Sequence, residues 1–284
     1  MVRRHVVRDA RRLADALRRG PARRGHHPHA GRLHGRSAVA HRRREPARRQ
    51  TLRLRNVGQT ASRHPRKGLP MKSLHGMFDP DHVLVGITPT GWTNDDFPLL
   101  GNDISFGQIV SEMALAEYQG CSVGHKFPKD EAVLKAELDR RGLRVSEPWH
   151  STFFTVKNMR ERSIEAFHDV VGFIKRMGGT TVVVAELGHA VHQQAVPPIA
   201  NKPHFSDEQW AAMTSGLNEL GRMANEAGMT LCYHHHMGTG VMTRADTDRL
   251  MAETDSDLVH LLLDTGHLYW AGDDPFDMAK AYGS

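Results

Sequence analysis

Three consecutive histidines are the strongest chemical signal in the sequence. His234, His235 and His236 directly follow a short apolar run. Successive side chains of a strand point to opposite faces, so His234 and His236 are expected on one face and His235 on the other. Imidazole nitrogens are common ligands of transition metals. The alternative is a solvated loop in a chain that contains 20 histidines.

A carboxylate follows the next apolar run. Asp264 comes after three leucines, where an ionised group is costly unless it is paired or bound to metal. Adjacent strands lie about 4.8 Å apart, so His234 and Asp264 could share one ion. Imidazole with carboxylate suits Mn²⁺, Co²⁺, Fe²⁺ or Zn²⁺ better than Ca²⁺. We predict His234 and Asp264 as ligands and expect His235 to be replaceable; the alternative for Asp264 is a cap of the following turn.

Polar and aromatic residues also follow the other strand-like runs. In a (β/α)8 enzyme such positions meet at the C-terminal rim of the barrel, where catalytic groups collect. Simpler roles compete with function at each position: an ion pair for Glu186, a solvated side chain for Lys126, and rim packing for the tryptophans. The residues in question are Trp92, Asn94, Asp95, Asp96, His125, Lys126, Trp149, His150, Glu186, His189 and His267.

The runs that precede these residues alternate with segments of helical spacing. Gly142, Gly178 and Gly228 stand where helices should stop, and Ser206 with Gln209 resembles a capping box. Six strand-then-helix units predict a parallel α/β fold with helices outside the sheet. Residues 86–91 lack the G-x-G-x-x-G pattern of a dinucleotide-binding fold. We therefore predict a (β/α)8 TIM barrel of which about six βα units are present. The expected strands are 83–88, 121–123, 143–146, 180–185, 229–233 and 258–263, and the expected helices are 106–118, 131–141, 163–177 and 207–227.

Four stretches resemble a known family. Residues 86–96 (GITPTGWTNDD), 124–128 (GHKFP), 233–239 (YHHHMGT) and 263–267 (LDTGH) are similar to the inosose dehydratase family. That family belongs to the xylose-isomerase-like, endonuclease-IV-like TIM barrels, and the resemblance covers residues 80–284. It implies metal ligands at the ends of strands five to eight, with His234 in the fifth-strand position and Asp264 in the sixth. The fifth-strand histidine, in place of a common glutamate, departs from the isomerases of the superfamily.

The resemblance implies loss of water from 2-keto-myo-inositol (scyllo-inosose) to give a trihydroxycyclohexane-dione. A divalent ion, Mn²⁺ or Co²⁺, would act as a Lewis acid, and the need for a thiol cofactor such as glutathione is left open. Glu186 and His267 are the candidates for general base and acid, in either order. A ketose epimerase or isomerase is the first rival, and an inactive fragment is the second. The candidates for substrate binding are Trp92, Asn94, Asp95, Lys126, Trp149 and His236.

Charge divides the chain near Met71. Residues 1–70 hold 21 Lys and Arg against three acidic residues, a formal charge of +18, whereas residues 71–284 hold 17 basic and 29 acidic residues, a charge of −12. The basic leader has few residues that could form a core and is expected to be disordered. It could be a non-specific nucleic-acid-binding arm, a targeting peptide or, as we favour, translated sequence ahead of a start at Met71. A DNA-repair endonuclease of the same superfamily would need a basic face, and the net charge of −12 on residues 71–284 disfavours that function.

Further expectations concern the whole chain. No run approaches the 18 apolar residues of a membrane span, and Cys121 and Cys232 fit structural thiols, so a cytoplasmic protein is expected. With six of eight units expected, the seventh and eighth strands and their ligands would be missing. The exposed edges of the first and last strands would favour self-association, so a homo-oligomer is considered, and little activity is expected from the chain as it stands.

Overall fold

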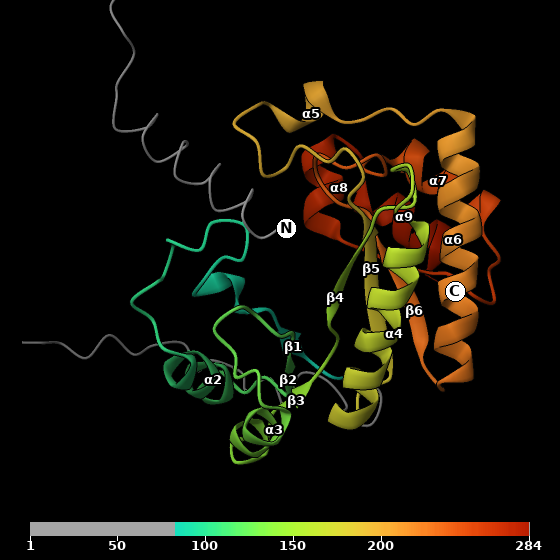
Figure 1. The fold of residues 1–284 in the computed structure, drawn as a ribbon. Coiled ribbons are helices and arrows are strands. Elements are labelled where there is room, and N and C mark those ends of the chain that lie inside the picture. Colours follow the sequence, from blue (N-terminus) through green and yellow to red (C-terminus); the bar gives the residue numbers. More distant parts are fainter. Residues whose placement is uncertain (1–82, 284) are drawn as a thin grey trace, which may run out of the picture. The chain divides into compact units, whose positions relative to one another are not determined.

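The computed structural model describes residues 83–283, a parallel α/β arrangement (Figure 1). Two sheets hold its strands, in the orders β1-β2-β3 and β4-β5-β6-β7, and every pairing is parallel. The strands are β1 (Gly86–Ile87), β2 (Gly120–Cys121), β3 (Arg144–Val145), β4 (Trp149–Thr152), β5 (Thr181–Glu186), β6 (Thr230–His234) and β7 (His260–Leu262).

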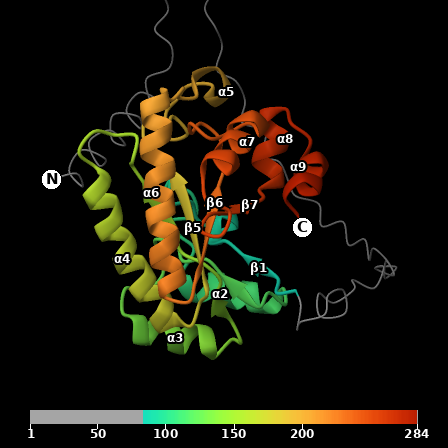
Figure 2. The same ribbon diagram turned by 90° about the vertical axis from the view of Figure 1, so that its right-hand side faces the viewer.

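Helices follow the strands in turn, as a βα series requires. Figure 2 shows α4 and α6 side by side outside the sheet, with β5 and β6 behind them. The short elements η2 (Pro89–Gly91) and α5 (Pro198–Asn201) lie in the segments after β1 and β5. The other helices are α2 (Phe106–Leu115), α3 (Glu131–Asp139), α4 (Arg160–Met177), α6 (Asp207–Glu226), α7 (Arg244–Glu253), α8 (Thr265–Ala271) and α9 (Pro275–Tyr282).

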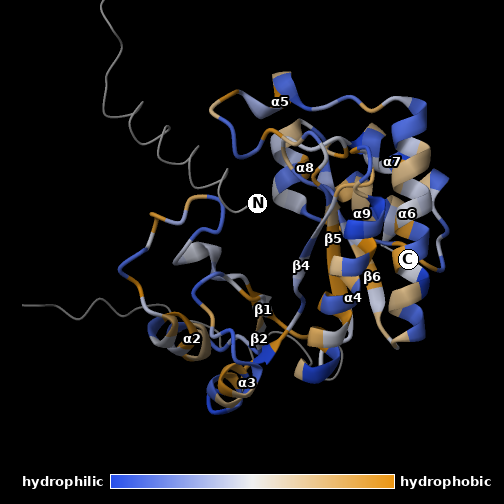
Figure 3. Cartoon of the chain, in the orientation of Figure 1, coloured by the Kyte–Doolittle hydropathy of each residue, from blue (hydrophilic) through white to orange (hydrophobic). Residues whose placement is uncertain are grey.

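One apolar core underlies both sheets. The strand β5 is apolar along most of its length (Figure 3), and Val182 and Val184 on it are fully buried. They belong to a cluster that extends from Ile109 on α2 through Leu217 on α6 to Val259 before β7. Burying a valine or leucine side chain stabilises a fold by roughly 1.5–3 kcal/mol, so this cluster is the main source of the fold's stability.

The predicted helices are present, and their ends follow the predicted signals. Gly178 ends α4 with a positive φ of 78°, and Ser206 and Gln209 form the capping box of α6. The two largest differences from the predicted helix boundaries are three residues each. The helix α2 ends three residues early, just before Glu117 adopts a φ of 65°. The helix α4 begins three residues early, and the Ser163 hydroxyl accepts the Phe153 N–H instead of starting the helix.

The third predicted strand is present as the short β3, and a further strand, β4, follows it. Ser146–Pro148 separates β3 from β4, and the two strands belong to different sheets. Proline has no N–H to give to a strand ladder, but the Pro148 carbonyl still accepts the Val183 N–H at 3.3 Å. Trp149 and His150 follow β3, as predicted, but they lie on a further strand, β4, which the prediction did not contain.

Some expectations concern parts of the chain that the structure does not describe. The predicted leader, residues 1–70, lies outside residues 83–283, as do the first residues of the predicted domain. Within the described range, no helix is long and apolar enough to cross a membrane.

Candidate active site

Three polar side chains converge where β6 and β7 end. The Nε2 atom of His234 lies 3.0 Å from Oδ2 of Asp264, and Nε2 of His267 lies 3.8 Å from the same oxygen. One nitrogen or oxygen atom from each residue falls within 4.8 Å of the others. We call His234, Asp264 and His267 the ligand trio. The structure thus brings together the two predicted metal ligands and a residue that was expected to transfer protons.

Secondary structure places each member of the trio. His234 is the last residue of β6, and Asp264 is the N-cap of α8, where its Oδ1 accepts the His267 N–H at 2.7 Å. His267 lies in the first turn of α8, three residues on. Capping and metal binding were alternatives for Asp264 in the sequence. In the structure Oδ1 makes the cap, which leaves Oδ2 facing the two imidazoles.

The protonation states of Asp264 and His267 suit a metal. Burial acts to raise the pKa of Asp264, but hydrogen bonds from His234 and from the His267 N–H outweigh it and lower that pKa. Burial lowers the pKa of His267. Metals bind carboxylates and neutral imidazoles. An ionised carboxylate between imidazoles is therefore a donor set that fits a divalent transition metal.

The histidines after β6 point as strand alternation predicts. The His236 ring lies 5.4 Å from the His234 ring and 4.1 Å from the His267 ring. His235 lies on the other side and is fully buried, which lowers its pKa to about 4. Burial also lowers the pKa of His236 to about 3, and its Nδ1 lies 3.0 Å from the carbonyl of Met237. In the neutral ring Nδ1 donates that bond, so Nε2 carries the lone pair.

Trp149 and His192 form a wall beside the trio together with His236. The Trp149 ring is 5.4 Å from His234 and 5.6 Å from His236, and the His192 ring is 5.1 Å from His236. Sequence analysis missed His192, because it follows no strand directly and no local pattern marks it. The neighbouring candidate His189 lies 3.4 Å from the Gln209 side chain instead.

Three loops hold His192 in place. Asp96, after β1, accepts a hydrogen bond from Gln193 at 2.7 Å and lies 3.9 Å from the His192 ring nitrogen Nε2. On the other side, Val191 N–H donates to the Gly238 carbonyl at 2.8 Å. Gly238 has a φ of 69°, and a Cβ there would meet the His192 nitrogen at 2.9 Å, so only glycine allows this approach.

Glu186 does not have the surroundings expected of a proton carrier. Its side chain is fully buried, and its two oxygens accept five hydrogen bonds. The donors are the hydroxyls of Thr152 and Thr155 and the N–H groups of Phe154, Thr155 and Gly188. A carboxylate has about four lone-pair sites, so these donors leave no oxygen free for a substrate proton.

The candidates after β1 and β2 form hydrogen bonds with nearby side chains and backbone groups. Trp92 donates to Glu112 on α2, and Asn94 accepts the N–H groups of Asp96 and Phe97. Asp95 lies 2.6 Å from His125, and Lys126 donates to the Asn102 carbonyl at 2.7 Å. In the described part of the chain, no recorded hydrogen bond joins Trp92, Asn94, Asp95 or Lys126 to the ligand trio.

A second residue that sequence analysis missed is Glu147, in the segment between β3 and β4. Burial raises its pKa, and His234 lowers it through their electrostatic interaction. The signal in the sequence was its place two residues before Trp149, which would put both on one face of a continuous strand.

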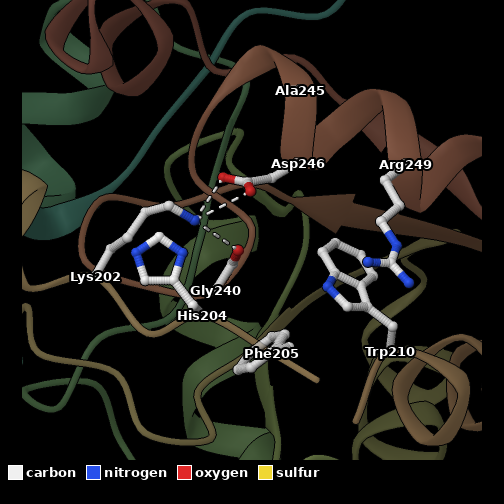
Figure 4. Close-up of a pocket in the computed structure, with 8 residues that line it drawn as sticks. All are labelled: Lys202, His204, Phe205, Trp210, Gly240, Ala245, Asp246 and Arg249. Atoms are coloured by element: carbon white, nitrogen blue, oxygen red, sulfur yellow. Dashed lines mark hydrogen bonds and ion pairs between the residues drawn. The ribbon is translucent and has the colours of Figure 1, made fainter. Parts of the chain in front are cut away.

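A pocket of about 320 Å³ lies at the start of α7 (Figure 4). Its charged residues are already paired. Lys202 Nζ lies 2.9 Å from Asp246, and the Arg249 guanidinium covers the Trp210 ring at 4.6 Å while pairing with Asp207. The pocket shares no residue with the ligand trio, and its ion pairs fasten the segment after α5 to α7.

Comparison with known proteins identifies the relatives of this chain. Residues 110–284 match the family of xylose isomerase-like TIM barrels. An inosose dehydratase of Clostridium botulinum (strain Alaska E43 / Type E3) is 46% identical over 209 residues, 72% of this chain and 69% of that protein.

Two solved structures share the fold. The probable 3-DHS dehydratase AsbF of Bacillus anthracis, involved in petrobactin synthesis, has a TM-score of 0.55 and 14% identity, covering 71% of this chain and 70% of that one. A xylose isomerase-like TIM barrel protein of Mycobacterium smegmatis, in complex with magnesium, has a TM-score of 0.51 and 15% identity, with 67% of each chain covered. The chain belongs to the inosose dehydratase family of xylose isomerase-like TIM barrels.

Proposed function

We propose that this chain is a metal-dependent dehydratase that removes water from 2-keto-myo-inositol to give a trihydroxycyclohexane-dione. Membership of the inosose dehydratase family supports the reaction. The observation that carries the site is the ligand trio, in which an ionised carboxylate lies between two imidazoles at the adjacent ends of β6 and β7.

A divalent ion, Mn²⁺ or Co²⁺, would be held by Nε2 of His234, Oδ2 of Asp264 and Nε2 of His267. When bound, it supplies a Lewis acid for the ketone and the adjacent hydroxyl of the substrate. This assignment moves His267 from proton transfer to metal binding, because its Nε2 faces Asp264.

His236 is our candidate for the residue that takes the proton next to the ketone. Its Nδ1 donates to the Met237 carbonyl, so Nε2 is free to accept the proton. Glu186 and His267 were the candidates for this proton transfer, in either order, but the oxygens of Glu186 already accept five hydrogen bonds and His267 faces Asp264. The hydroxyl on the neighbouring carbon then leaves with a proton that the protonated His236 returns, so that the proton and the hydroxyl depart together as water. Trp149 and His192, which flank His236, would contact the ring of the substrate and its hydroxyls.

The test is incubation of the full chain with scyllo-inosose and Mn²⁺ or Co²⁺, followed by detection of the dione. The unsubstituted chain should form it, contrary to the expectation of little activity from the sequence, because all three proposed ligands lie within the described residues. Asp264→Ala should not form it. His260→Ala, an exposed histidine on β7, is the control and should keep full activity. A ketose product of unchanged formula would indicate an epimerase or isomerase, and no reaction with either metal would refute the proposal.

A further inference from the structure

His235 makes a hydrogen bond that strand alternation did not predict. Its Nε2 accepts the backbone N–H of Asp264 at 3.2 Å. The last recorded pair of β6 and β7 is His234 with Leu262, so this N–H lies beyond the ladder, where the chain turns into α8. The imidazole therefore accepts a hydrogen bond from the Asp264 N–H, which has no partner in the β6–β7 ladder.

The other ring nitrogen of His235 indicates that this hydrogen bond is the reason for a histidine at this position. The side chain is fully buried, and Nδ1 has no hydrogen-bond partner among the described residues. A ring that accepts at Nε2 carries its proton on Nδ1, and leaving a buried donor without a partner is destabilising. A leucine would fill the same space without that cost, but it could not accept the Asp264 N–H.

Asp264 is consequently held at two points that leave one oxygen free. His235 holds its backbone nitrogen, and the His267 N–H holds Oδ1 at 2.7 Å. The remaining oxygen, Oδ2, faces Nε2 of His234 at 3.0 Å and Nε2 of His267 at 3.8 Å. With the backbone and Oδ1 fixed, the carboxylate has little freedom to turn Oδ2 away.

We propose that His235 is a positioning residue for the metal site: by holding the backbone of Asp264, it aims Oδ2 at the space between the two imidazoles. This role rests on the metal site of the proposed function. It reverses the expectation that His235 is replaceable because it points to the opposite face. Residues that orient metal ligands typically contribute 10–100-fold in metal affinity.

The experiment compares His235→Leu, which keeps apolar volume but has no acceptor, with His235→Gln, which keeps a side-chain acceptor. Titration calorimetry of the full chain measures Mn²⁺ affinity, and hydrogen exchange of the metal-free protein measures protection of the Asp264 amide. His235→Leu should weaken Mn²⁺ binding about 10–100-fold and speed exchange at Asp264. His235→Gln should restore most of both. His235→Met replaces the leucine variant if that variant does not fold.

Leu231→Ala is the matched control, because Leu231 is fully buried on the same face of β6. It should lower the stability while leaving the Mn²⁺ affinity of the folded protein unchanged. Unaltered affinity or unaltered Asp264 exchange in His235→Leu would overturn the role of His235. Absence of Mn²⁺ binding by the unsubstituted chain would instead overturn the metal site of the proposed function, and this role with it.

Discussion

At the scale of single residues, the site depends on one carboxylate with two tasks. Asp264 caps α8 through Oδ1 and faces His234 and His267 through Oδ2. Capping requires the short side chain at the start of the helix, and the helix in turn brings His267 around to the same oxygen. The cap is therefore part of the geometry of the ligand trio and does not compete with it.

The first prediction is that His234→Ala, Asp264→Ala and His267→Ala each abolish tight Mn²⁺ or Co²⁺ binding, because each removes one of the three proposed ligands. Titration calorimetry and metal content after dialysis measure the loss. His260→Ala, at an exposed position of β7, should bind metal like the unsubstituted chain. Retention of metal by His267→Ala alone would return His267 to the proton-transfer role that the sequence suggested.

At the scale of elements, the loops that follow the strands determine which carboxylates at the strand ends remain available to bind a ligand. The oxygens of Glu186, at the end of β5, accept five hydrogen bonds. The donors belong to Thr152, Phe154, Thr155 and Gly188. These bonds join the end of β4 and the segment after it to the segment after β5. The Glu186 carboxylate therefore has a structural role, because it holds these two segments together. Asp264 differs, because its Oδ2 remains available to bind a metal ion.

The second prediction concerns that junction. A Cβ on Gly188 would lie 1.9 Å from Thr155 Oγ1 and 2.5 Å from Glu186 Oε1, so Gly188→Ala must break the network. Glu186→Ala leaves five donors without their acceptor. Each substitution should lower the free energy of unfolding by about 3 kcal/mol or more, since one buried unsatisfied polar group already costs about 1–3 kcal/mol.

Urea unfolding followed by circular dichroism measures this change. Gly107→Ala is the control, because a Cβ at this position of α2 meets nothing within 4 Å. Alanine in place of a helical glycine should leave the stability equal or raise it by roughly 0.5–1 kcal/mol. A stable Glu186→Ala protein without activity would favour the original catalytic assignment of Glu186.

The same contrast explains what the sequence could predict. Periodicity and end signals predicted the parallel α/β order, and alternation on β6 predicted that His234 and His236 share a face. The roles of Glu186 and His235 depend on partners 29 to 34 residues away in the chain, which local patterns do not encode. The His192 side chain depends on three loops, and the β3–β4 division depends on pairing with two different neighbours.

At the scale of the whole molecule, the two sheets share one core. The chain crosses from β3 to β4 through Ser146–Pro148, and the apolar cluster runs without a break from Met113 on α2 to Leu231 on β6. Interiors packed in this way transmit strain. Residues far from the ligand trio should therefore influence it through stability, even without a contact.

The third prediction tests this coupling with Met113→Ala. Met113 is fully buried on α2, which lies between β1 and β2 in the chain, whereas the trio lies at the end of β6 and the start of α8. Removing a buried methionine side chain typically costs about 2–5 kcal/mol. If one core holds both sheets, Met113→Ala should lower the urea midpoint for loss of helical signal and the midpoint for release of bound Mn²⁺ by the same amount. The two midpoints should stay coincident, as in a two-state transition.

The control is Ile174→Ala on α4. Ile174 is also fully buried in the cluster, so its replacement should shift both midpoints in the same way. A first transition that lowers the helical signal while Mn²⁺ stays bound would show that the β1–β3 part unfolds independently, and the shared core would then not be what holds the site together.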